Sequence, residues 1–97
     1  MKVSNITSTS GNSIANQFIV TDNDVHGNKI TYFQSYDSTI VKIIHDEWGG
    51  NAEIYLDENY WDFSKTTGKY RNLFLGETKS ETQKKINSGV YILTDLN

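Results

Sequence analysis

Apolar and polar residues alternate in four segments of the first part of the chain, and this alternation predicts β-strands. In one of them, Ala52, Ile54 and Leu56 share a face, with a glutamate and a tyrosine opposite. The connections between the segments are rich in Asn, Asp and Gly, which favour turns. Because short connections join neighbouring strands, an antiparallel meander is expected from residues 16–21, 29–35, 39–44 and 52–56.

The apolar spacing then changes to three and four residues, which predicts helices. Tyr70, Leu73 and Phe74 fall on one face of a helix over residues 64–75, and a glycine follows where a helix C-terminus favours a left-handed residue. The sequence Thr-Lys-Ser-Glu at 78–81 is a capping box, which predicts the start of a second helix that ends near residue 88.

The expected fold class is therefore α+β: an antiparallel meander of about four strands, two short helices and a closing C-terminal strand at 90–94. A length of 97 residues fits a single domain, 1–97. Residues 1–15 are rich in Ser, Thr, Asn and Gly and have no apolar stripe, so they are expected to form a flexible arm or an edge strand.

Cysteine is absent, which excludes disulfides, thiolate catalysis and cysteine-ligated zinc. The longest apolar runs, 18–20 and 90–93, are too short to span a bilayer. No apolar stretch typical of a signal peptide follows the first residues. We expect a cytoplasmic protein without a membrane partner.

The sequence pattern gives little support for a catalytic site or a metal site. Residues 22–27 imitate the opening of a calcium loop, but Phe33 stands where the loop needs a bidentate glutamate. A metal site using His26 and His45 would need two loops to meet, and we expect those loops at opposite ends of the sheet. The histidines belong to no nucleophile motif, and no phosphate loop is present. The chain is expected to be no enzyme and to use no cofactor.

Charge is unevenly distributed along the chain. Residues 1–63 hold nine acids and three bases, and residues 64–97 hold six bases and three acids. The acidic half predicts a surface that could bind a protein partner, formed by Asp46, Glu47, Glu53, Asp57, Glu58 and Asp62. The basic half, with aromatic residues close by, predicts an alternative surface for nucleic acid, formed by Lys65, Lys69, Arg71, Lys79, Lys84 and Lys85.

Three segments carry a family resemblance: Tyr-Phe-Gln-Ser-Tyr-Asp-Ser at 32–38, the long stretch 56–78 around Tyr-Trp-Asp-Phe-Ser-Lys, and the ending at 88–97. They resemble a family of small uncharacterised proteins encoded by phages and plasmids of Gram-positive bacteria. The resemblance covers residues 30–97 and brings no catalytic residues with it. It implies an accessory protein of a mobile element, acting in a bacterial host cell, such as an anti-CRISPR protein, another inhibitor of host defence, or a regulator.

Three hypotheses follow. The first is a non-enzymatic inhibitor that binds a host or CRISPR-type nuclease and blocks its nucleic-acid site with the acidic surface. The second is a regulatory protein that binds nucleic acid through the basic helices. The third is an assembly factor that forms homo-oligomers, such as dimers, through an exposed sheet edge.

Overall fold

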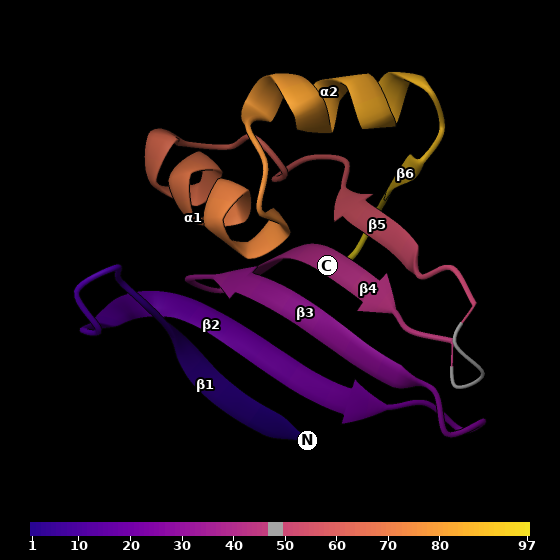
Figure 1. Ribbon diagram of the computed structural model, residues 1–97, viewed down its shortest axis with the longest axis horizontal. Helices are drawn as coiled ribbons and strands as arrows, with labels where there is room; N and C mark the ends of the chain where they lie inside the picture. Colours follow the sequence, from indigo (N-terminus) through magenta and orange to yellow (C-terminus); the bar gives the residue numbers. More distant parts are fainter. Residues whose placement is uncertain (47–49) are drawn as a thin grey trace.

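The fold is a six-stranded sheet with two helices on one face, as seen in a computed structural model of the chain (Figure 1). The structure describes residues 1–46 and 50–97. The strands follow their sequence order across the sheet: β1 (Lys2–Thr7), β2 (Ser13–Asn23), β3 (Lys29–Ser35), β4 (Ser38–Ile44), β5 (Glu53–Asp57) and β6 (Tyr91–Thr94). The helices, α1 (Lys65–Leu75) and α2 (Lys79–Asn87), connect β5 to β6.

The α+β class is confirmed, but the predicted meander was too small and the sheet is mixed rather than antiparallel. Strands β1 to β5 pair antiparallel, whereas β6 pairs parallel to β5. The two-helix connection carries the chain back to the end of the sheet where β5 begins, so the closing strand runs in the same direction. Strand β1 is the edge strand on the other side, one of the two alternatives expected for residues 1–15, and its pattern was weak because only Ile6 of its residues is buried.

The core lies between the sheet and the helices. Phe33 on β3, Val41 on β4 and Leu56 on β5 are completely buried and lie side by side through the strand pairing. Helix α1 contributes Phe74, whose ring stacks on that of Phe33 with centroids 5.6 Å apart. This contact fixes α1 over the middle of the sheet, so the start of α1 and the turn before it are held at the sheet's margin.

The end of α1 and the start of α2 form as the sequence predicts. Ser64 caps α1 by accepting a hydrogen bond from the Thr67 amide, and Gly76 ends the helix with φ at 70°. Thr78 and Glu81 form the expected reciprocal capping box of α2. These caps fix the residue at which each helix starts. They therefore determine which side chains lie at the turn between α1 and α2.

Truncating the buried centre of β5 tests this description of the core. Leu56→Ala should lower the free energy of unfolding by about 2–5 kcal/mol, because the cavity it leaves is enclosed by packed neighbours. Urea denaturation followed by tryptophan fluorescence measures the loss. Val25→Ala is the control, since Val25 is 95% exposed and its truncation should change stability by less than about 0.5 kcal/mol. Equal effects of the two changes would contradict the assigned core.

Candidate functional site: a basic cavity beside helix α1

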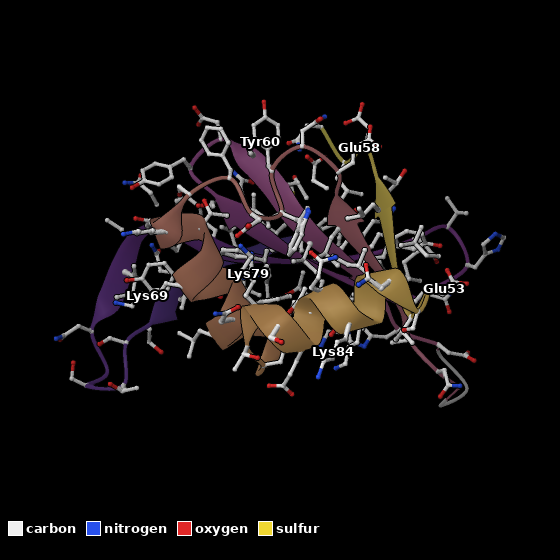
Figure 2. The ribbon with its side chains drawn as sticks, turned by 90° about the horizontal axis from the view of Figure 1, so that it is seen from above. Glu53, Glu58, Tyr60, Lys69, Lys79 and Lys84 are labelled. Atoms are coloured by element: carbon white, nitrogen blue, oxygen red, sulfur yellow. The ribbon has the colours of Figure 1, made fainter. Side chains whose placement is uncertain are left out.

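Four of the six basic residues singled out in the sequence line one cavity, which lies between α1, the turn before it and the start of α2. Its volume is about 750 Å³. The basic lining residues are Lys65, Lys69, Arg71 and Lys79, and the one acidic lining residue is Asp62. These five charges leave the cavity with a net charge of +3. Figure 2 shows Lys69 on α1 and Lys79 at the start of α2, with Lys84 further along α2.

Arg71 is the buried base of the cavity, with only 1% of its surface exposed. Its Nη1 donates to the Trp61 carbonyl at 2.6 Å and to Asp62 Oδ1 at 3.3 Å, and its Nη2 donates to Asn72 Oδ1 at 2.9 Å. The guanidinium also lies over the Trp61 ring, 5.2 Å from its centroid. Arg71 Nε has no hydrogen-bond partner among the residues that the structure describes.

Asp62 is the counter-charge of the cavity. Its Oδ2 lies 2.6 Å from Lys79 Nζ, and its other oxygen faces Arg71. Burial acts to raise the pKa of Asp62, but the hydrogen bonds from Lys79 and Arg71 outweigh it and lower the pKa overall. The carboxylate therefore stays ionised and is already satisfied by two cations, so it neutralises only part of their charge.

Two exposed lysines complete the basic lining. Lys65 and Lys69 are four residues apart on α1, so they lie on the same side of the helix. The positive end of the helix dipole points toward the same region. The cavity thus presents flexible ammonium groups at its rim and a fixed guanidinium at its base, which is an arrangement suited to holding an anion such as phosphate.

Phe63 is a lining residue that the sequence reasoning missed. It is 69% exposed and stands directly before the α1 N-cap, at the wall of the cavity. It belongs to no apolar stripe, because it lies in a turn rather than on a helix or strand face. An apolar residue just before the N-cap often packs against the fourth helical residue, but that residue is Gly68, which leaves the Phe63 ring without a partner on the helix.

The last two predicted basic residues lie outside the cavity. Lys84 is exposed on α2. Lys85 Nζ lies 3.0 Å from Glu77 Oε1, and the same carboxylate accepts hydrogen bonds from the Tyr91 hydroxyl and the Thr82 hydroxyl. Glu77 is 4% exposed, so this cluster ties the turn between the helices to β6.

Among the residues that the structure describes, the predicted acids do not form one surface. Asp57 is completely buried, and its two oxygens accept hydrogen bonds from the amides of Asn59, Tyr60 and Leu96. Its role in an exposed surface is therefore wrong, because a carboxylate at a strand end serves here as the cap of a turn. Asp62 belongs to the basic cavity instead.

The remaining acids are divided between the two ends of β5. Asp46 and Glu53 line a cavity where β5 begins, whereas Glu58 follows its last residue, roughly 15 Å along the strand (Figure 2). Glu47 lies outside the described residues.

The expected separation of the two histidine-bearing loops was wrong. Asp24 from the first loop and His45 and Asp46 from the second line the same cavity, because alternate turns of a meander lie at the same end of a sheet. His45 Nε2 is hydrogen-bonded to the Thr31 hydroxyl at 3.1 Å. Within residues 1–46 and 50–97, no three His, Asp or Glu side chains are placed to hold a metal ion together.

Residues 1–89 match the sequence model of a family of unknown function (DUF8033). The chain belongs to this family. The match includes β1 and β2 as well as the basic cavity. No curated protein and no solved structure matches the chain. Across the described residues, no helix is long and apolar enough to cross a membrane.

The Glu77 cluster predicts how stability depends on pH. Burial acts to raise the pKa of Glu77, but the hydrogen bonds from Tyr91, Lys85 and Thr82 outweigh it, so the folded-state pKa lies below the ordinary 4.5. The carboxylate therefore stabilises the fold at neutral pH and loses that contribution as the pH falls below about 4.5. Glu77→Gln should cost about 1–2 kcal/mol at pH 7.

Urea denaturation of both proteins at a series of pH values from 7 to 3 measures this contribution. The difference in stability between wild type and Glu77→Gln should shrink as the pH falls. Glu58→Gln is the matched control, because Glu58 is exposed, and it should behave like wild type throughout. A difference for Glu77→Gln that stays constant over the whole range would contradict the proposed ionised cluster.

Proposed function

We propose that this chain binds nucleic acid through the basic cavity beside α1. The observation that carries the proposal is the convergence of four cationic side chains on one cavity with a single, already paired carboxylate. Lysine and arginine side chains that neutralise phosphates are the main source of nucleic-acid affinity. The buried guanidinium of Arg71 adds a fixed, hydrogen-bonded positive charge below the mobile lysines.

The charge outside the cavity limits how much nucleic acid can be contacted. The whole chain carries −3 and the cavity +3, so the remainder carries −6. A long phosphate backbone laid across that surface would be repelled, because like charges face each other. The proposed contact is therefore short and local, involving a few phosphates at the cavity.

The inhibitor hypothesis has less support from the observed geometry. It needs a cluster of exposed carboxylates that imitates phosphates, and the predicted acids are divided among a buried cap, a salt bridge in the basic cavity and two ends of a strand. A nuclease partner remains a prediction from the family resemblance alone.

Fluorescence polarisation with a 5′-labelled 12-nucleotide DNA strand tests the proposal. Wild-type protein should bind at 50 mM salt, with a plot of log K against log[salt] whose slope is about −0.7 per phosphate contacted, or roughly −1.4 to −2.8 for two to four phosphates. Replacing Lys65 and Lys69 together by glutamine should weaken binding and flatten that slope by about 0.7 for each lysine that contacts a phosphate.

Lys84→Gln is the control, because it removes one lysine charge from α2 outside the cavity, half of what the double variant removes inside it, and its binding should stay close to wild type. An absence of binding at 50 mM salt would refute the proposal. An effect of Lys84→Gln as large as half that of the double variant would show that general charge, and not the cavity, holds the strand.

A second candidate function is self-association through β6. This strand lies at the edge of the sheet as described, with a neighbour on one side in β5. Three apolar side chains on or beside it are exposed: Val90 at 61%, Ile92 at 49% and Leu93 at 39%. An exposed apolar edge without charge or proline readily pairs with a strand of another chain.

Sedimentation velocity tests this candidate. Wild-type protein should form dimers at high concentration, and Ile92→Lys should shift them to monomers by placing a charge on the edge. Val25→Lys, which adds the same charge at an exposed position in the β2–β3 turn, should leave the dimer unchanged. A wild-type protein that sediments as a monomer at every concentration would exclude this candidate.

A further inference from the structure

A second, smaller cavity adjoins the basic one and has a different character. The two cavities share Phe63 and Ser64, which stand between them. The smaller cavity has a volume of about 180 Å³ and is lined by three aromatic rings, those of Tyr36, Tyr60 and Phe63, together with Ile40 and several hydroxyl groups. It is below the usual size of a pocket for a drug-sized ligand, about 300 Å³, so it suits one small planar ring system.

Phe63 presents an aromatic surface at the boundary between the cavities. It is 69% exposed, so its ring is accessible to a ligand. Tyr60 holds it edge to face, with ring centroids 5.4 Å apart and an interplanar angle of 64°. An exposed ring that is held in place beside a cationic cavity is a platform for stacking.

Tyr36 approaches the small cavity from the turn between β3 and β4. Its φ is 54°, in the left-handed region that a bulky side chain rarely adopts, and its ring is 53% exposed. Its amide donates to the carbonyl of Asn16 at 2.7 Å, which holds the turn in this conformation. A glycine would adopt this backbone conformation without strain, whereas the tyrosine adopts it at a conformational cost.

We propose that the site takes single-stranded nucleic acid, with one unstacked base against Phe63 and Tyr36 and the adjoining phosphates in the basic cavity. This inference rests on the proposed function and adds that the bound nucleic acid is single-stranded. Binding of phosphates alone would need only the cationic side chains of the basic cavity. A base–aromatic contact requires a base that is free of its stack, which single strands offer and duplexes do not. The adjoining aromatic and basic cavities match the two chemical parts of a nucleotide.

The test compares three labelled probes of 12 nucleotides at 50 mM salt: a DNA strand with bases, a strand of the same length made of abasic sites, and a blunt duplex. Wild-type protein should bind the base-bearing strand about tenfold more tightly than either of the others, within the range measured for stacking of one base. The abasic strand measures the phosphate contribution by itself.

Two substitutions at Phe63 separate stacking from apolar bulk. Phe63→Leu should lose the tenfold preference for the base-bearing strand, whereas Phe63→Trp should keep it, and neither should change binding of the abasic strand. Tyr36→Gly, which suits the left-handed backbone, should also reduce the preference without lowering the stability measured in urea. Because Phe63 is largely exposed, its variants are expected to fold.

The outcomes distinguish the two levels of the proposal. Binding of no probe would overturn nucleic-acid binding itself. Equal affinity for the base-bearing and abasic strands, equal affinity for the duplex, or an equal loss for both strands in Phe63→Leu would overturn only the single-strand inference and leave phosphate binding in place.

Discussion

The basic cavity depends on the buried guanidinium of Arg71. Its bonds to the Trp61 carbonyl, Asp62 and Asn72 join the turn that follows β5 to the helix that follows the turn. Lys79 also holds Asp62 through an ion pair of 2.6 Å, but it belongs to α2, so Arg71 is the charge that joins this turn to α1. Burying an arginine is costly unless its donors are satisfied. The guanidinium of Arg71 donates three hydrogen bonds and lies over one aromatic ring. The function proposed for the cavity therefore depends on Arg71, a buried cation that also holds the local structure together.

Asp57 supports the same turn from the other side. Its carboxylate accepts the amides of Asn59 and Tyr60 at the start of the turn, and that of Leu96 from beyond β6. One buried anion and one buried cation thus fix the two ends of a segment of about seven residues that carries Tyr60 and Phe63. These polar contacts hold the turn that carries Phe63, whereas Tyr60 is also held by packing against the core. Rigid support of this kind is what a stacking surface needs, because a mobile ring would lose conformational entropy on binding.

The sequence predicted what is decided locally. Alternation located β3, β4 and β5, the spacing of Tyr70, Leu73 and Phe74 located α1, and the capping box at 78–81 located the start of α2, because each of these signals involves residues close together in the sequence. Strand β1 was ambiguous because its burial comes from a single residue, Ile6, against a core assembled from distant segments. The parallel pairing of β6 was missed for a similar reason, since direction depends on the path of the whole connection.

The candidate site residues also differ in whether their placement is decided by the local sequence or by contacts with distant residues. Sequence reasoning grouped the charges by position, and it therefore placed Asp57, Asp62 and Arg71 on surfaces. Burial of Asp57 depends on Leu96, 39 residues away, and no local pattern records that contact. Asp62 lies two residues before the N-cap Ser64, and its carboxylate pairs with Arg71 on α1 and with Lys79 at the start of α2 instead of joining other acids.

The opposite signs of the cavity and the rest of the molecule define what kind of binding the fold can support. A chain of net charge −3 attracts no polyanion from a distance, so electrostatic steering does not contribute to encounter as it does for basic proteins. Affinity must then come from close contacts with the exposed Lys65 and Lys69, while the buried Arg71 adds a fixed positive charge beneath them. Within a few ångströms of the cavity the local charge of +3 prevails, because salt screens charges farther away than about 10 Å. A ligand is therefore recognised where its charge and its ring system both fit, and rejected where it extends over the acidic remainder of the surface.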